Sequence, residues 1–186
     1  MIEIKFIGRG GQGGKTAAYL AAEAAFVGGK QVQAFPEFGP EREGAPVFAF
    51  TRISDEHITI HSSVKHPDVV IIIDESLIHE LPVTEGMDSE GTILINTSGI
   101  SPHLRKHLGH IKNIYYVNAS CISQDLLGRN MPNTPMLGAL AKMSDLFSID
   151  VLKNAFAELF KKKLKPEILQ KNLEAMDRAY KEVKKS

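Results

Sequence analysis

The sequence predicts an α/β fold with three layers, α/β/α, and a mixed sheet. Three observations predict it. An alternating strand at residues 2–7 runs into a glycine-rich loop and then a helix, which is a Rossmann-like start. Short apolar strands then alternate with helical segments through the middle of the chain. The C-terminal part has helical periodicity at about 149–183. The chain of 186 residues is expected to form a single domain, 1–186.

The first elements follow directly from their residue types. The glycine loop occupies residues 8–14, and an alanine-rich helix is expected at 15–27. Gly28-Gly29 ends this helix, because glycine readily takes the backbone conformation that closes a helix. Residues 31–35 alternate as a second strand. The segment after them is rich in proline and glycine, which argues against regular structure there.

Two more strands, 47–53 and 57–61, are expected on either side of a turn at 54–56. A connection this short makes the pair antiparallel, so the sheet is predicted to be mixed. Residues 68–73 form a continuously apolar strand, the pattern of a sheet that is covered on both faces.

The remaining elements continue this alternation and end in helices. Strands are expected at 92–95 and 113–117, and helices at 76–81, 102–108, 122–127, 136–147, 149–162 and 166–183. Ser101 is expected to cap the helix at 102–108, with Pro102 at its first position. Thr134 is expected to cap the helix that follows it, with Pro135 in the first turn.

Composition excludes several classes of function. The chain has 22 basic and 22 acidic residues, so nothing in its charge suggests nucleic acid or an anionic membrane as a partner. The single cysteine, Cys121, cannot form a disulfide within the chain or a site with several thiolates, and it is expected to be buried. No signal peptide or membrane-spanning stretch is evident, which predicts a cytoplasmic protein.

The glycine loop is the first candidate site, and several interpretations of it stay open. Its spacing fits G-x-G-x-x-G between a strand and a helix, where backbone N–H groups favour an anion. The end of the loop also imitates a P-loop, but Arg9 stands where the first glycine is needed. An NAD site would need an acid at the end of the second strand, where Phe35-Pro36 stands and Glu37 lies beyond. Alternatively, the glycines only make a tight turn. The candidate residues are Gly8, Arg9, Gly10, Gly11, Gln12 and Gly13.

Two further segments stand out. Residues 35–46 combine prolines, glycines, two aromatic residues and four charges, a mixture that favours an interface or functional loop over an ordinary surface loop. Residues 133–139 form the helix start described above. The candidate residues for an interface or for shaping an active site are Glu37, Glu41, Arg42, Gly44, Asn133 and Thr134.

These three segments together resemble the gamma subunit of pyruvate or 2-oxoacid:ferredoxin oxidoreductases. The matching residues are 8–13, 38–47 and 133–138, in the order and spacing of that family, and the resemblance covers essentially the whole chain. Where many members carry an apolar residue after the loop, this chain has Gly14-Lys15.

The resemblance implies a role in an assembled enzyme. Such enzymes convert a 2-oxoacid, coenzyme A and oxidised ferredoxin into acyl-CoA, carbon dioxide and reduced ferredoxin. Pyruvate is the substrate the resemblance favours, and indolepyruvate or 2-oxoglutarate are the alternatives. Thiamine diphosphate, Mg and iron–sulfur clusters are expected on partner subunits, because this chain has one cysteine and no thiamine diphosphate motif. The implied partners are alpha, beta and delta subunits, with ferredoxin reached through the complex and coenzyme A a candidate contact of this chain. A free-standing nucleotide-binding protein is the alternative of another class.

No catalytic residue and no metal site are predicted. His103 and His107 are four residues apart on an expected helix, which is compatible with a pair of metal ligands. No acidic third ligand is evident near them, so both are expected to face solvent.

Overall fold

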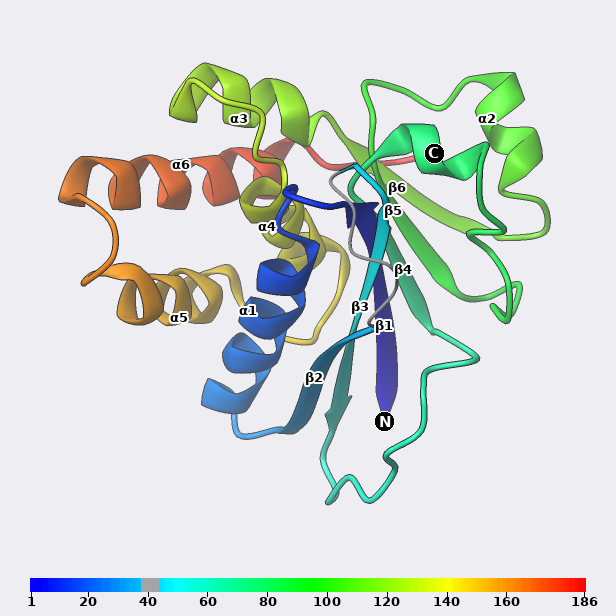
Figure 1. The fold of residues 1–186 in the computed structure, drawn as a ribbon, viewed down its shortest axis with the longest axis horizontal. Helices are drawn as coiled ribbons and strands as arrows, with labels where there is room; N and C mark the ends of the chain where they lie inside the picture. Colours follow the sequence, from blue (N-terminus) through cyan, green and yellow to red (C-terminus); the bar gives the residue numbers. More distant parts are fainter. Residues whose placement is uncertain (38–43) are drawn as a thin grey trace.

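The computed structural model describes residues 1–37 and 44–186, and it has a seven-stranded mixed sheet with helices on both faces (Figure 1). The predicted α/β class is therefore confirmed. The strands are β1 (Ile2–Arg9), β2 (Gln31–Glu37), β3 (Pro46–Ser54), β4 (Val69–Ile72), β5 (Thr92–Asn96), β6 (Asn113–Val117) and β7 (Lys184–Lys185). The helices are α1 (Gly14–Val27), the 3-10 helix η1 (Glu75–Ile78), α2 (Pro102–His107), α3 (Ala119–Leu127), α4 (Asn133–Met143), α5 (Ile149–Phe160) and α6 (Pro166–Glu182).

The strand order in the sheet is β2-β3-β1-β4-β5-β6-β7. Strands β1, β4, β5 and β6 are parallel neighbours, whereas β3 is antiparallel to both β1 and β2. Strand β2 therefore runs parallel to β1 but is separated from it by β3. The C-terminal strand β7, which the sequence pattern did not predict, adds an antiparallel edge on β6.

The predicted strand at 57–61 is wrong. Both edges of β3 are already hydrogen-bonded, to β1 and to β2, so no edge is free for a hairpin partner. Instead, the buried guanidinium of Arg52 holds the segment as it leaves β3. It donates hydrogen bonds to the carbonyl oxygens of Ile60 (3.3 Å) and Ser62 (2.7 Å) and forms an ion pair with Glu3 at 2.7 Å. The sheet is mixed because β3 lies between β1 and β2.

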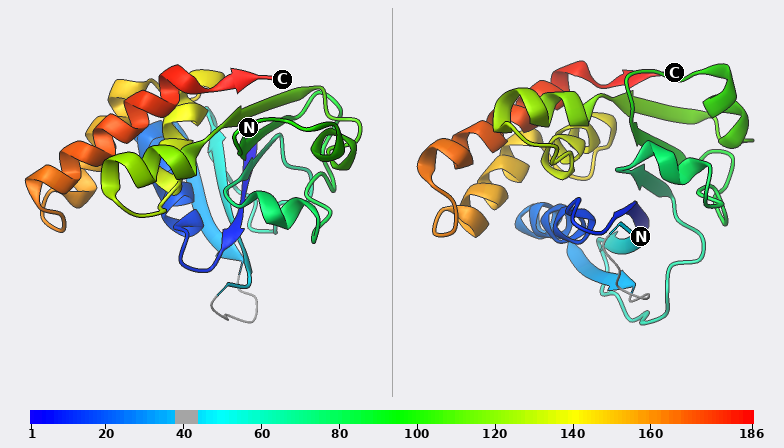
Figure 2. Two further views of the ribbon diagram at one scale, coloured as in Figure 1. Left: turned by 90° about the horizontal axis from the view of Figure 1, so that it is seen from above. Right: turned by 45° about the horizontal axis from the view of Figure 1, so that its top comes forward.

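Two apolar cores cover the two faces of the sheet. Figure 2 shows the helices that lie on either side of it. Helices α1, α3, α4, α5 and α6 pack on one face, and η1 and α2 pack on the other. Strand β4 contributes to both, because Val69 and Ile71 point to the first core and Val70 and Ile72 to the second. This explains its continuously apolar sequence.

Several predicted element ends need correction. Thr134 is not a cap: α4 begins at Asn133, and Pro132 holds the N-cap position without a side-chain hydrogen bond. Strand β2 continues through Pro36 and Glu37, which were predicted to lie in a loop. By contrast, the Ser101 cap is confirmed, since its side chain accepts a hydrogen bond from the N–H of Leu104.

Other boundaries differ by smaller amounts. The helix predicted at 76–81 is the short η1, α3 begins at Ala119, and α4 ends at Met143. Cys121 is exposed, contrary to its predicted burial. Within the described residues, no helix is both long and apolar enough to cross a membrane. The prediction of a single domain stays a prediction.

Candidate functional site

The candidate site lies where the connections of the parallel strands change sides. After β1 the chain enters α1 on one face of the sheet, and after the neighbouring strand β4 it enters η1 on the other face. The two connections diverge outside the carboxyl ends of β1 and β4, and such a point of divergence is the usual ligand position in open α/β sheets. The glycine loop, residues 8–14, lies on one side of this point, between β1 and α1.

The glycine loop takes its shape from two left-handed residues. Gly11 has φ +91° and Gly13 has φ +79°, conformations that residues with a Cβ rarely adopt. At Gly13 a second constraint applies, because an added Cβ would lie 2.6 Å from Nδ2 and 2.7 Å from Cγ of Asn133. The first and third sequence motifs therefore touch at this glycine.

Arg9 ties the loop to two other segments. Its guanidinium forms ion pairs with Glu80 (2.5 Å) and Asp74 (3.4 Å) and donates hydrogen bonds to Ser76 Oγ (2.7 Å) and to the carbonyl oxygen of Gly44 (3.0 Å). A backbone bond from Gly10 N–H to Ala45 O, 3.0 Å, reinforces the contact with the second motif. The positive charge of Arg9 is thus already balanced by two carboxylates within the chain.

Gln12 and Asp74 connect the two diverging segments across the β1–β4 boundary. The side chain of Gln12 accepts a hydrogen bond from the backbone N–H of Arg9 (2.7 Å) and donates one to Asp74 (2.6 Å). Partial burial raises the pKa of Asp74, but hydrogen bonds from Ser76 and Gln12 and the charge of Arg9 outweigh this effect. The pKa of Asp74 consequently lies below its usual value, and the carboxylate is ionised at neutral pH.

Asn133 is a polar residue left without a partner in a buried position. It is only 4% exposed, and its Oδ1 has no hydrogen-bond partner among the described residues. An unsatisfied buried acceptor costs about 1–3 kcal/mol, and native proteins keep few of them. Such a group at the edge of a candidate site suggests that its role depends on something other than the stability of the isolated chain.

A cavity of about 340 Å³ opens at the carboxyl ends of the parallel strands. Polar side chains dominate its lining, among them Gln12, Asp74, Asn96, Asn118 and Ser120. A larger cavity, about 920 Å³, lies at the opposite, amino ends of the strands, near Ile2 and Thr92. The smaller cavity is the better candidate, because Gln12 of the glycine loop and Asp74, which follows β4 where the connections diverge, both line it.

The remaining predicted site residues divide into three groups. Thr134 is buried in the first turn of α4, next to Asn133. Glu37 lies exposed at the carboxyl end of β2, at the same end of the strands as the glycine loop. Strand β3 lies between β2 and β1, so Glu37 is two strand spacings of about 4.8 Å from β1. This separation does not suit the acid of an NAD site, which normally follows the strand next to β1. Glu41 and Arg42 lie outside the described residues.

Sequence reasoning missed part of the site. Ser76 and Glu80 both bind Arg9. Ser76 lies in the short 3-10 helix η1 and Glu80 follows it, and this segment carries no sequence motif. Asn96, at the end of β5, bridges two segments through its amide, which donates to Ile73 O and to Ser120 Oγ, both at 2.8 Å. The signal that could have found Asp74 and Asn96 is their position, since each directly follows or ends an apolar parallel strand.

Comparison with known proteins gives the family. The sequence profile of pyruvate ferredoxin/flavodoxin oxidoreductases matches residues 3–182. The chain belongs to this family. The pyruvate synthase subunit PorC of Thermotoga maritima is 43% identical over 182 residues, which cover 98% of this chain and 94% of the relative. The common gamma subunit of the pyruvate/ketoisovalerate oxidoreductases of Pyrococcus furiosus is 44% identical over 181 residues, 97% and 96% of the two chains.

A solved structure from the same family agrees in fold. The crystal structure of the pyruvate oxidoreductase subunit PorC from Thermotoga maritima matches with a TM-score of 0.88 and 40% identity, over 100% of this chain and 98% of that one. The resemblance to gamma subunits is therefore confirmed, and the family assignment covers the glycine loop and Asn133 alike. The arrangement of these residues offers hydrogen bonds and charge, including a hydrogen bond that the hydroxyl of Ser76 donates to Oδ1 of Asp74 at 2.6 Å.

Proposed function

We propose that this chain is the gamma subunit of an enzyme that converts pyruvate, coenzyme A and oxidised ferredoxin into acetyl-CoA, carbon dioxide and reduced ferredoxin. The observation that carries the proposal is full-length similarity, above 40% identity, to subunits named for pyruvate synthase and pyruvate oxidoreductases. Alpha, beta and delta subunits are the proposed partners, and isolated gamma chain is expected to be inactive.

The cofactors are proposed to reside on the partners. A single cysteine cannot hold a cluster that needs four thiolates, and the sequence has no thiamine diphosphate motif. The choice of 2-oxoacid is also assigned to other chains. One relative is named as the common subunit of oxidoreductases for pyruvate and for ketoisovalerate, which supports a gamma subunit that does not select the substrate.

Reconstitution tests this role directly. Complexes of the alpha, beta and delta subunits are purified with and without this chain, and ferredoxin reduction is followed with pyruvate and coenzyme A. We expect activity only when the chain is present, and the highest rate with pyruvate in a panel that includes ketoisovalerate, 2-oxoglutarate and indolepyruvate. Full activity of the complex without this chain would contradict the proposal.

Within the complex, we propose that the glycine loop and the α4 start, residues 8–13 and 133–134, face a partner subunit. The charge of Arg9 is balanced by Glu80 and Asp74, which supports a contact with a mixed protein surface over one with a coenzyme A phosphate. Asn133 lies against Gly13 of this loop, and its buried Oδ1 has no hydrogen-bond partner among the described residues.

The variant Arg9→Ala distinguishes a partner subunit from coenzyme A as the group that this surface contacts. We expect less of the chain to co-purify with its partners and unchanged affinity of the assembled complex for coenzyme A, measured by isothermal titration. Arg178→Ala is the matched control, because Arg178 also bridges two carboxylates, Asp125 and Glu182, on a different face. Normal assembly with weakened coenzyme A binding would instead assign the loop to the coenzyme.

The segment around Arg42 gives a second test from sequence alone. Its flanking acids, Glu41 and Glu43, suggest an ion-pair network between subunits. Pull-down of the partner subunits with Arg42→Glu should show reduced retention, and more so at low salt, where charge pairs are less screened. Full retention at both salt concentrations would refute this contact.

A further inference from the structure

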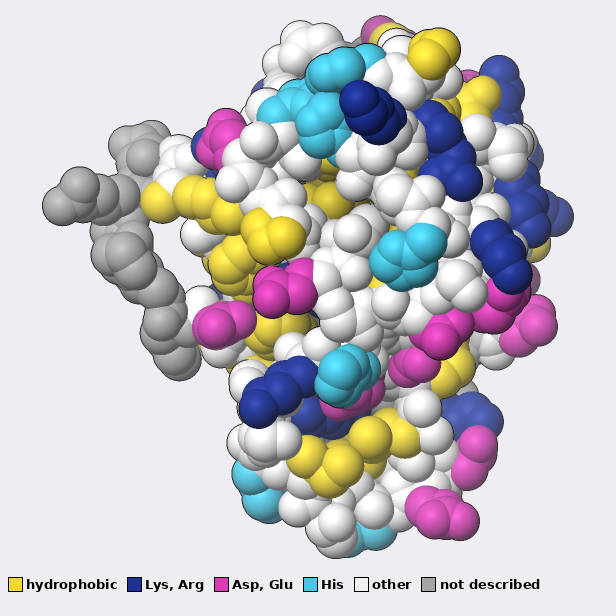
Figure 3. All heavy atoms as spheres, turned by 90° about the vertical axis from the view of Figure 1, so that its right-hand side faces the viewer, with side chains coloured by type: hydrophobic (Ala, Val, Ile, Leu, Met, Phe, Trp, Pro, Cys, Tyr) yellow, Lys and Arg dark blue, Asp and Glu magenta, His cyan; other side chains and the backbone are white. Residues whose placement is uncertain are grey.

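Three histidines from two separate segments meet on one surface of the protein. His79 directly follows η1, whereas His103 and His107 lie one turn apart on α2. All three are exposed, and Figure 3 shows histidine side chains gathered on the face where α2 lies. The sequence alone identified the pair His103 and His107 but not His79, which is 24 residues from His103 along the chain.

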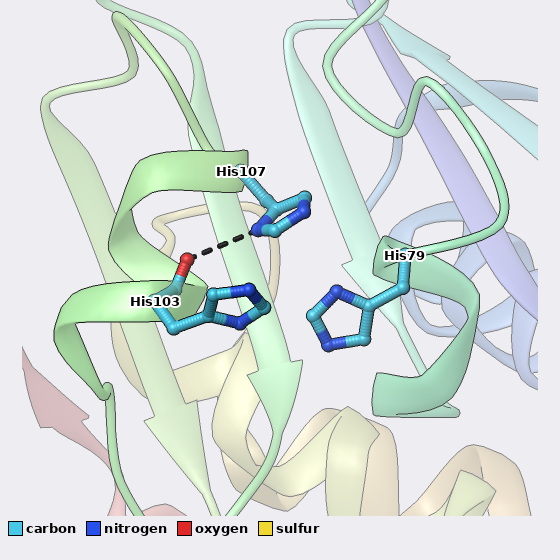
Figure 4. Close-up of side chains that lie close together, drawn as sticks. All are labelled: His79, His103 and His107. Atoms are coloured by element: carbon cyan, nitrogen blue, oxygen red, sulfur yellow. Dashed lines mark hydrogen bonds between the residues drawn. The ribbon is translucent and has the colours of Figure 1, made fainter.

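The rings face one another closely. Ring centroids are 5.1 Å apart for His79 and His103, 4.7 Å for His79 and His107, and 4.6 Å for His103 and His107. One ring nitrogen from each residue lies within 4.8 Å of the others (Figure 4). A tetrahedral ion with metal–nitrogen bonds of about 2.0–2.1 Å sets its nitrogens about 3.4 Å apart, so a ring movement of about 1 Å closes the site. Exposed side chains rotate freely enough to do this.

One ring already has the outer hydrogen-bond contact that metal-binding histidines usually make. Nδ1 of His107 lies 3.0 Å from the carbonyl oxygen of His103. A carbonyl oxygen can only accept, so Nδ1 is the donor in this contact, and Nε2 is the nitrogen left to bind a metal ion. Histidine ligands usually have this outer hydrogen bond, which fixes the tautomer and aims the ring. The neighbouring cation Arg105 points elsewhere, since it donates to the carbonyl oxygen of Gly109 at 3.2 Å.

We propose that His79, His103 and His107 bind a divalent transition metal ion of the zinc class, with water in the fourth position. Imidazole nitrogens suit Zn²⁺, Cu²⁺ and Ni²⁺, whereas Mg²⁺ and Ca²⁺ need oxygen ligands. Three protein ligands with one open position form a recognised type of zinc site. The family assignment does not provide this site, and neither does the proposed role of the glycine loop.

The ion would join two elements that are separate along the chain. It connects the end of η1 to α2, the two helical segments on this face of the sheet. His79 is also next to Glu80, whose carboxylate holds Arg9 at 2.5 Å. Binding would therefore fix the segment that positions the glycine loop, and it would stabilise the folded chain in proportion to the free metal concentration.

Isothermal titration of the full chain with ZnCl2 tests the site. We expect one equivalent to bind with a micromolar or tighter dissociation constant and no heat from MgCl2. The double variant His103→Ala, His107→Ala should weaken zinc binding by more than about tenfold. The chain offers a matched control in His57 and His61, which are also exposed and four residues apart but have no third histidine beside them among the described residues.

Thermal unfolding gives a second readout. Zinc should raise the unfolding midpoint of the wild type and of the His57→Ala, His61→Ala control, but not that of the His103→Ala, His107→Ala variant. The single variant His79→Gln, on the other segment, should lose the zinc response as well. It keeps the test valid if the His103→Ala, His107→Ala variant fails to fold. Equal zinc affinity in the two double variants, an unchanged response in His79→Gln, or wild-type binding weaker than micromolar would each overturn the proposal.

Discussion

Replacing Gly13 by alanine tests whether the glycine loop and α4 fit together as the structure has them. The backbone at Gly13 is left-handed, with φ +79°, and the side chain of Asn133 lies against it. The new methyl group would lie 2.6 Å from Nδ2 and 2.7 Å from Cγ of Asn133, whereas ordinary contact begins at 3.4 Å. One group must therefore move by close to an ångström, and Asn133, at 4% exposed, has little room.

The expected loss has two parts. A left-handed conformation costs an alanine about 1–2 kcal/mol. Forcing a side chain out of a packed site costs about 1–3 kcal/mol more. The free energy of unfolding of Gly13→Ala should consequently fall by about 2–5 kcal/mol, a large share of the 5–15 kcal/mol typical of a folded protein.

Gly11→Ala is the control that separates the two parts. Gly11 has φ +91° but no atom within 4 Å of an added Cβ, so it should lose only the conformational part, about 1–2 kcal/mol. The chain has no tryptophan, so unfolding in urea is best followed by far-UV circular dichroism. Equal losses in Gly11→Ala and Gly13→Ala would refute the close contact with Asn133.

A double-mutant cycle makes the test specific. Asn133→Ala alone should change stability by less than about 1 kcal/mol, because its buried Oδ1 has no partner to lose. In that background Gly13→Ala should cost clearly less than in the wild type, since the Cγ and Nδ2 atoms are gone, but somewhat more than Gly11→Ala, because the Cβ of residue 133 stays 3.1 Å from the new methyl group. If the loss is the same with and without Asn133, the clash lies elsewhere. In the assembled enzyme, Asn133→Ala should still reduce assembly if a partner uses this side chain.

Three further predictions concern other parts of the chain. Gly138→Ala should destabilise by about 2–4 kcal/mol despite better helix propensity, because its Cβ would lie 2.1 Å from the carbonyl oxygen of Met176 in the neighbouring helix; urea unfolding measures this, and a stabilised variant would refute it. Arg52→Met should cost about 3–5 kcal/mol by leaving Glu3 unpaired, and a neutral result would show that the buried ion pair is dispensable. Because the pKa of Asp74 is lowered in the folded state, its ionisation contributes stability above an unfolded pKa of about 3.9 that is lost as pH falls through the folded value; Asp74→Asn should therefore lose less stability than the wild type below about pH 5, and parallel pH curves would contradict this.

The sequence predicted most of the fold because most elements carry their own local signal. The alternating start of β1, the apolar run of β4 and the helical periodicity of α6 each identify an element without knowledge of its neighbours. The hairpin at 57–61 failed for the opposite reason. Whether an alternating segment pairs as a strand depends on a free edge, and β1 and β2 occupy both edges of β3. That information is not local.

The candidate site was predictable to the same extent. The three motifs were visible as unusual residue combinations, and the structure brings Gly13 to Asn133 and Arg9 to Gly44. The partners of Arg9 were not visible, because Ser76 and Glu80 are ordinary surface residue types that acquire their role through the position of η1. His79 escaped notice for the same reason, since only the fold places it beside α2.

The two edge strands of the sheet limit how this subunit can join others. One edge strand, β2, contains Pro36, which has no N–H to offer an incoming strand. The other edge is the two-residue strand β7, made of Lys184 and Lys185, whose charges repel a second copy of the same edge. Both features disfavour extension of the sheet by a partner's strand and protect against edge-to-edge aggregation. Association of this chain should therefore proceed through side chains on loops and helices, and a chain shortened by the removal of β7 should expose β6 and aggregate more readily.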